Sequence, residues 1–375
     1  MTAIIETGAE ATDRSDIDFP VIDCDVHPMF GGVQVLRPYL SPRVQRRIFG
    51  QEISPVTRDP NRIPHPTSGL RLDAVGPDQG PPGSNAEFSL QQWIIPFGIS
   101  SSVLIPIQAG SILPWGDEQA GVEYLAALNR YFISEWCEFD SRYRLAISVS
   151  PYNMKSAVQE IEELADVPGV CAVFVPHAAV AMGRSQLFPM YEAAERHGLP
   201  VLLHPTGGEG NLRDAPWLAG GLPDTYPERH SMLLQPGQAI LASVIFGGVF
   251  DHFPKLKVLL VEYGITWAAS MIARMDKAWE LGDGELSGLL RKPSEYVFDN
   301  IRFTTQPLDE PPKREMLWDI LEMVHAERTL MFSSDYPHWD NDNPRLTLST
   351  RLPRHLRRRI GFETARETFG ARAGL

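Results

Sequence analysis

Short apolar runs alternate along the chain with longer stretches in which apolar residues recur every three and four positions. Short runs rich in Val, Ile and Leu are typical of buried strands, and the longer spacing is typical of amphipathic helices. The apolar runs lie at residues 19–27, 101–108, 144–151, 170–176, 200–205, 257–264, 301–307 and 329–337. The pattern therefore predicts a strand followed by a helix, repeated along the chain.

The stretches between most of these runs predict helices. Four of them combine an apolar stripe with residues suited to helix ends, at 122–139, 154–165, 187–198 and 313–326. Near-continuous apolar strands covered by helices are typical of parallel sheets, and no glycine-rich phosphate loop follows the first strand as in an open doubly wound sheet. We therefore expect an α/β fold, a (β/α)8 TIM barrel.

The 375 residues suit one large barrel domain at 19–375, preceded by a flexible tail at 1–18. Residues 28–95 are rich in Pro and Gly and lie between the first two predicted strands. A long irregular segment at this position favours an inserted cap on the barrel face where active sites form. The last stretch, 344–375, reads as a basic helical segment packed on the outside of the barrel.

Charge and cysteine content exclude several classes of protein. There are 47 acidic residues against 34 Lys and Arg, a net charge of -13, whereas nucleic acids and anionic membranes select basic surfaces. Three widely spaced cysteines predict neither a disulfide framework nor a thiolate zinc site. No apolar run reaches the roughly 18 to 20 residues of a membrane span, and no signal peptide is recognisable, so we expect a cytoplasmic protein.

The first predicted strand ends in a pair of residues that can chelate a metal. Side chains on a strand alternate in direction, so Asp25 and His27 point the same way, into the expected barrel mouth. A carboxylate and an imidazole two residues apart suit a borderline metal such as zinc. Taken alone, the pair fits a capping or solvated turn equally well.

Three further strand ends strengthen the metal hypothesis. His204, Glu262 and Asp335 end the fifth, sixth and eighth apolar runs. In a (β/α)8 barrel these positions converge on one axis. Burying several unpaired ionisable groups together is costly, and a bound cation removes that cost.

The motifs at these strand ends resemble those of a known family. They read IDCDVHP at 22–28, HGLPVLLHP at 197–205, IFGGVFDHFPKLKVLLVEYG at 245–264 and SSDYPHWD at 333–340. The chain resembles the amidohydrolase superfamily, in the amidohydrolase-2 branch of proteins like 2-amino-3-carboxymuconate-semialdehyde decarboxylase. The resemblance runs from about Val21 to the C-terminus.

The resemblance implies one divalent metal ion, bound by Asp25, His27, His204 and Asp335. Members with two metals use a carboxylated lysine on the fourth strand and a histidine on the sixth. This chain has no lysine in its fourth run and has Glu262 in its sixth, so a single ion is expected. Zinc suits the ligands best, and manganese, iron or cobalt also fit.

The main functional hypothesis is a metal-dependent hydrolase that activates water against a small, aromatic or carboxylate-bearing substrate. Asp335 would carry the proton, and Glu262 would act as a second acid or base, or else pair with an inward arginine. The alternative is non-oxidative decarboxylation, although decarboxylases of the branch often have histidine where Glu262 stands. A binding protein with a vestigial site is a third possibility. The branch is often dimeric, so the resemblance also allows a homodimer.

Two histidines complete the candidate catalytic set. His338 follows Asp335 by three residues and is interpreted as a contact to substrate or to a metal ligand, with an ordinary loop histidine as the alternative. His230 either faces the site or simply begins a helix. Aromatic residues after the strands can line a pocket or pack in the core, namely Trp115, Trp217, Tyr336 and Trp339. Loop arginines can bind a substrate carboxylate or lie in solvent, namely Arg184, Arg213 and Arg229.

Overall fold

Eight parallel strands, hydrogen bonded in sequence order, form the centre of the described part of the chain. The computed structural model describes residues 17–49, 69–112, 116–176, 180–206, 223, 225–282, 288–348 and 352–375. The strands are β1 (Val21–Val26), β2 (Ile99–Leu104), β3 (Tyr143–Ser148), β4 (Val170–Pro176), β5 (Val201–His204), β6 (Val258–Leu260), β7 (Ile301–Thr304) and β8 (Leu330–Met331). Six of them fall inside the predicted runs, whereas β2 begins two residues and β3 one residue before the predicted start.

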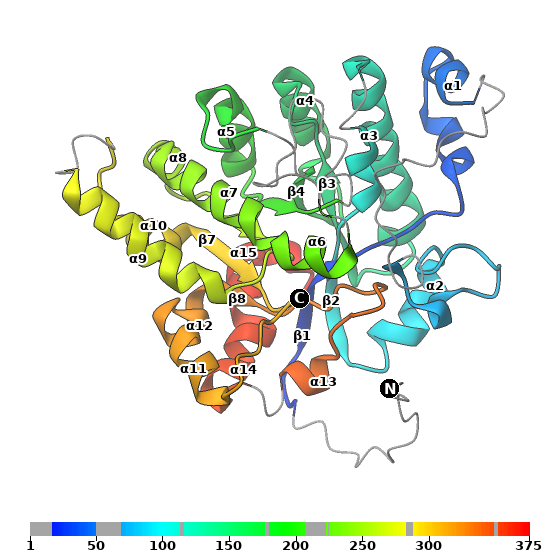
Figure 1. Ribbon diagram of the computed structural model, residues 1–375. Coiled ribbons are helices and arrows are strands. Elements are labelled where there is room, and N and C mark those ends of the chain that lie inside the picture. Colours follow the sequence, from blue (N-terminus) through cyan, green and yellow to red (C-terminus); the bar gives the residue numbers. More distant parts are fainter. Residues whose placement is uncertain are drawn as a thin grey trace.

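Backbone hydrogen bonds between β1 and the residues after β8 bring the two ends of the sheet together. The Cys24 N–H donates to the Phe332 carbonyl at 2.9 Å, and the His27 N–H donates to the Tyr336 carbonyl at 2.7 Å. Figure 1 shows the helices arranged around the strands. The structure confirms the predicted (β/α)8 barrel, and the barrel is nearly closed.

The four predicted helices are present, with small shifts at their ends. They are α3 (Glu118–Phe132), continued by the π-helical turn η6 (Ile133–Cys137), α4 (Met154–Leu164), α5 (Phe188–Arg196) and α11 (Arg314–Met323). Helix α3 begins four residues before the predicted start because the Asp117 carboxylate accepts from the Ala120 N–H and caps it. The remaining longer helices are α1 (Pro42–Phe49), α7 (Leu234–Phe246), α9 (Thr266–Leu281) and α10 (Pro293–Asn300).

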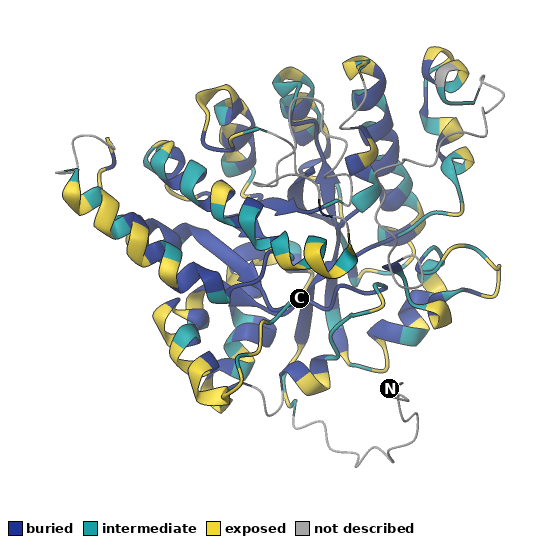
Figure 2. Cartoon of the chain, in the orientation of Figure 1, coloured by how far each residue is buried: buried dark blue, intermediate teal, exposed yellow. Residues whose placement is uncertain are grey.

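The strands carry the core, and the outer faces of the helices meet solvent (Figure 2). All six residues of β1 are buried, including two aspartates. The C-terminal segment is a chain of short helices rather than one, comprising α13 (Pro344–Thr347), α14 (Arg354–Arg358), η8 (Arg359–Glu363), α15 (Thr364–Phe369) and η9 (Gly370–Ala373). The Phe332 N–H donates to the Ile360 carbonyl at 2.8 Å, so this segment covers the seam beside β8.

The described part of the predicted insertion contains only short elements. They are η1 (Val33–Tyr39), α1, η3 (Leu72–Ala74), α2 (Ala86–Ser89) and the π-helical turn η4 (Leu90–Ile94). Its second half lies against the loop after β8, because the Arg71 N–H donates to the Pro337 carbonyl at 2.9 Å. The predicted tail lies outside the described residues except for Ile17 and Asp18. No helix in the described ranges is long and apolar enough to cross a membrane.

Candidate metal centre

His27 is held by β1 with one ring nitrogen directed at two carboxylates. Its Nδ1 lies 3.0 Å from the Ile105 carbonyl oxygen, which can only accept, so Nδ1 carries the proton. Its Nε2 lies 3.3 Å from Asp25 Oδ1 and 2.9 Å from Asp335 Oδ1. In the neutral tautomer with its proton on Nδ1, the Nε2 lone pair points at the carboxylates, and this is the form of histidine that binds a metal.

His204 repeats this arrangement at the end of β5. Its Nδ1 donates to the Pro205 carbonyl, and its Nε2 lies 3.5 Å from Asp25 Oδ2. One ligand atom from each of the four predicted metal-binding residues lies within 4.8 Å of the others, and all four residues are buried. The structure thus brings together Asp25, His27, His204 and Asp335.

The polar atoms at the centre of this group fit a cation. Among the buried side-chain atoms of the described residues that have no hydrogen-bond partner, four lie in this group: both carboxylate oxygens of Asp25, His27 Nε2 and His204 Nε2. The two nitrogens have only ion-pair contacts to carboxylates. Buried polar atoms without partners are costly, and each of these is a metal-ligand atom type. Two imidazoles and two carboxylates suit one divalent ion with room for a substrate oxygen.

Glu262 and Asp335 share an unusual backbone conformation where β6 and β8 give way to loops. Their φ angles are 63° and 65°, in the left-handed region that non-glycine residues rarely adopt. The Glu262 N–H donates to Thr304 Oγ1 at 3.2 Å, and the Asp335 N–H donates to the Asp25 carbonyl at 3.0 Å. Such strain persists where the surroundings impose it and is concentrated at functional sites.

The electrostatics of the site also favour a cation. Burial lowers the pKa of His204, but the Asp25 and Glu262 carboxylates outweigh it and hold that pKa well above its usual value. Burial raises the pKa of Asp335, but His338 and His27 bring it below its usual value. The raised pKa of His204 thus reflects the two carboxylates beside it, and a divalent ion bound to a neutral His204 would balance the same negative charge.

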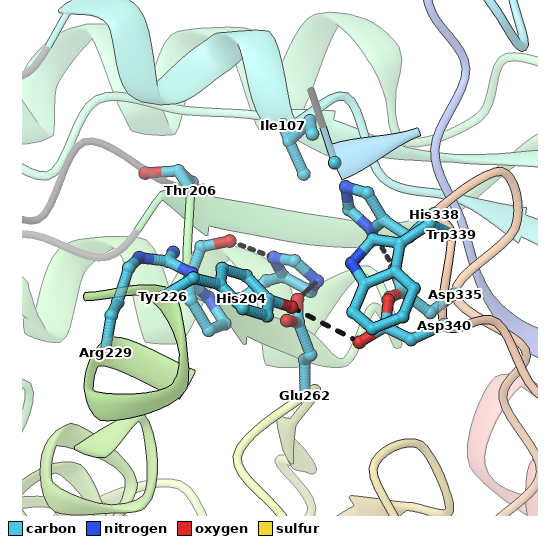
Figure 3. Close-up of a pocket in the computed structure, with 12 residues that line it drawn as sticks. Ile107, His204, Thr206, Tyr226, Arg229, Glu262, Asp335, His338, Trp339 and Asp340 are labelled. Atoms are coloured by element: carbon cyan, nitrogen blue, oxygen red, sulfur yellow. Dashed lines mark hydrogen bonds and ion pairs between the residues drawn. The ribbon is translucent and has the colours of Figure 1, made fainter. Parts of the chain in front are cut away.

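A cavity of about 90 Å³ opens onto His204 and Asp335, two of the four predicted metal-binding residues (Figure 3). Glu262 and His338 line it, with Glu262 Oε2 at 2.9 Å from His204 Nε2 and His338 Nδ1 paired with Asp335 Oδ1. Burial lowers the pKa of His338, but Asp335 outweighs it and raises that pKa to about 9. The rest of the lining consists of Gly69, Ile107, Pro205, Thr206, Tyr226, Arg229, Trp339 and Asp340.

The remaining site residues predicted from the sequence lie, where the structure describes them, at the rim of the cavity, in its lining, on the surface or in the core. His230, on α6 (Tyr226–Met232), lies at the rim with Nε2 3.6 Å from Asp340 Oδ2 and is not among the residues that line the cavity. Arg229 lines the cavity, whereas Arg184 is exposed. Tyr336 is 1% exposed and stacks on Trp93, so of its two predicted places, the pocket and the core, the structure shows the core. Trp115, Trp217 and Arg213 lie outside the described residues.

Two acidic residues in or beside the site, Asp340 and Asp23, were not predicted as site residues from the sequence. Asp340 closes the SSDYPHWD motif and accepts from the Tyr226 hydroxyl at 3.4 Å. Asp23 precedes Asp25 by two residues and therefore shares its side of β1, which was an available signal. Burial raises the pKa of Asp23 to about 7, although hydrogen bonds from Ser334 and Trp93 lower it.

A family model described as Amidohydrolase matches residues 22–371. The chain belongs to this family. Several solved structures share its fold. An amidohydrolase from Mycobacterium avium subsp. paratuberculosis is 21% identical with a TM-score of 0.72, over 94% of this chain and 100% of that one.

Two of the other structures are named as decarboxylases. 2,6-Dihydroxybenzoate decarboxylase from Rhizobium is 16% identical with a TM-score of 0.64, over 93% of this chain and 98% of that one. 5-Carboxyvanillate decarboxylase from Novosphingobium aromaticivorans, complexed with manganese and 4-hydroxy-3-methoxy-5-nitrobenzoic acid, is 15% identical with a TM-score of 0.62, over 94% and 96%. At these identities the likeness establishes the fold alone.

Proposed function

We propose that this amidohydrolase-family chain is a metal-dependent decarboxylase of small aromatic carboxylates. The observation that carries the proposal is the composition of the cavity, which is lined by His204 and Asp335 of the four metal-binding residues, by His338 and by Arg229. The names of the two decarboxylases of the same fold support it. This reverses the order of the two sequence hypotheses, in which hydrolysis came first.

Different residues of the site would bind the metal ion, bind the substrate and supply the proton for decarboxylation. A divalent ion, held by Asp25, His27, His204 and Asp335, would supply positive charge that binds and polarises substrate oxygens. Arg229 provides a guanidinium suited to a carboxylate. The bond to the carboxyl carbon breaks, carbon dioxide leaves, and the electron pair stays on the ring carbon. That carbon then takes a proton, which His338 can give from Nε2 because Nδ1 is paired with Asp335.

Aromatic side chains at the mouth of the cavity support an aromatic substrate. Tyr226 and Trp339 both line the cavity, with ring centroids 6.0 Å apart in an edge-to-face arrangement. Ile107 adds an apolar wall. A planar ring can pack against such groups while its polar substituents reach the metal centre.

The ligand set suits zinc or manganese, and the manganese in one structure of the same fold adds weight to the latter. We propose a small molecule as the substrate, with a cytoplasmic location and a homodimer as further predictions.

Hydrolysis is the second candidate, and Glu262 favours it. Burial and Asp335 raise the pKa of Glu262, but His204 and His338 outweigh them and lower it. An ionised carboxylate beside the metal ligands is suited to take a proton from an attacking water. Decarboxylation needs no such base.

The two reactions leave different products. The protein, loaded with Mn²⁺ or Zn²⁺ in H₂¹⁸O, is incubated with 2,6-dihydroxybenzoate, 5-carboxyvanillate and aryl esters and lactones, and the products are analysed by mass spectrometry. We expect carbon dioxide release and a product that has lost one carboxyl group. A product that carries ¹⁸O without carbon dioxide release would instead establish hydrolysis.

A further inference from the structure

Asp23 is a fully buried carboxylate beside the metal centre that no step of the proposed reaction uses. Each of its two oxygens accepts two hydrogen bonds. The donors are Ser334 N at 2.8 Å and Asp25 N at 3.3 Å on Oδ1, with Ser334 Oγ at 2.6 Å and Trp93 Nε1 at 3.0 Å on Oδ2. All four acceptor positions of the carboxylate are therefore filled.

These donors come from three separate parts of the chain. Asp25 lies on β1, Ser334 lies in the loop after β8, and Trp93 lies on η4 in the predicted insertion. One carboxylate thus ties the strand that bears two metal ligands to the loop that bears another.

The hydrogen bonds between Asp23 and Ser334 also restrain Asp335, the residue that follows Ser334. The Ser334 hydroxyl donates to Asp23 and accepts from the Tyr336 N–H at 3.1 Å, so both neighbours of Asp335 are fixed. Asp335 has the strained φ of 65°, which needs such support. A carboxylate free to relax from this conformation would move away from the other three ligands.

We propose that Asp23 is a positioning residue of the metal centre. Through Ser334 it holds the backbone of Asp335 in the conformation that directs its carboxylate at the ligand group, and through Trp93 it links the predicted insertion to that group. The inference rests on the metal binding within the proposed function and is independent of the reaction catalysed. Removing partners outside the ligand set costs metal sites about 10- to 100-fold in affinity.

The test is the affinity of the metal-free protein for Mn²⁺, measured by calorimetric titration of the wild type and Asp23→Asn. The amide keeps the size of the side chain but turns one acceptor into a donor that faces donors. Asn300→Asp is the matched control: Asn300 is 1% exposed, donates to two backbone carbonyls, and lies before β7 at the opposite end of the barrel. We expect D23N to bind Mn²⁺ about 10- to 100-fold more weakly and N300D to match the wild type.

Thermal unfolding of the metal-free variants separates positioning from simple destabilisation. A D23N protein that binds Mn²⁺ as the wild type does, or no more weakly than N300D, overturns the inference. If D23N does not fold, Trp93→Phe decides, since it removes one donor and keeps the Asp23 side chain: weaker Mn²⁺ binding supports the inference, and unchanged binding overturns it. A wild type that binds neither Mn²⁺ nor Zn²⁺ refutes the metal centre itself, a separate result.

Discussion

At the scale of single residues, the site depends on which nitrogen of each histidine carries a proton. His27 and His204 both commit Nδ1 to a backbone carbonyl, so the Nε2 lone pairs face Asp25. The alternation of side chains on β1 predicted from sequence that Asp25 and His27 point together. The carbonyl partner of His27 could not be predicted, because Ile105 lies 78 residues away along the chain.

Replacing His27 with Ala should abolish tight metal binding. It removes a ligand outright, so we expect an affinity for Mn²⁺ more than about 100-fold below the wild type, beyond the cost of losing an outer partner. His230→Ala is the control, because His230 contacts Asp340 at the rim and not the ligand group. Metal content after dialysis measures both, and a fully loaded H27A protein would contradict the assignment.

His338 and Glu262 separate the two candidate reactions. If His338 protonates the substrate carbon, His338→Gln should lower kcat by about 10²- to 10⁴-fold, while Glu262→Gln has a much smaller effect. If Glu262 is the base of a hydrolase, the order reverses. Steady-state kinetics on the identified substrate, with metal content matched between variants, measures the two effects. Equal losses in both variants would exclude a simple division of roles.

At the scale of elements, the sequence predicted the strands well and their ends poorly. Apolar runs locate the strands because both faces of a parallel strand are buried. Tyr336 shows the limit: it is an aromatic residue after a strand, as a pocket residue would be, yet it packs on Trp93 and its hydroxyl donates to Gln92, 244 residues away. Contacts between distant segments of this kind leave no local pattern.

The left-handed backbone conformation of Glu262, after β6, predicts how two substitutions there change the stability of the protein. Glu262→Gly and Glu262→Ala both remove the carboxylate, but only alanine keeps a Cβ at a φ of 63°. We expect the glycine variant to be more stable by about 0.5–1 kcal/mol. The same pair at Glu192, exposed within α5, should show the opposite order, because glycine is disfavoured in helices. Urea unfolding of the metal-free variants measures the stability difference at each position. If the alanine variant is the more stable one at both positions, the backbone at Glu262 is not strained.

At the scale of the whole molecule, the metal centre lies where the barrel closes. β1 supplies two ligands and the loop after β8 supplies a third, and these segments are joined by hydrogen bonds from Cys24, His27 and Asp335. The repeated strand-and-helix pattern predicted this convergence, because strand ends meet on one barrel face. It could not predict that the seam is also covered by the C-terminal helices, through the Ile360 carbonyl.

Because its ligands span this seam, a bound ion should stabilise the entire fold. A ligand that binds only the folded state adds about 2.7 kcal/mol at a concentration 100 times its dissociation constant. We therefore expect EDTA to lower the thermal unfolding temperature and Mn²⁺ to restore it in a saturable way. H27A should unfold at one temperature with or without Mn²⁺, which separates the centre from weak binding at surface acids. A wild type that is shown by metal analysis to hold its ion, yet unfolds at the same temperature after chelation, would mean that the ion does not bridge the seam.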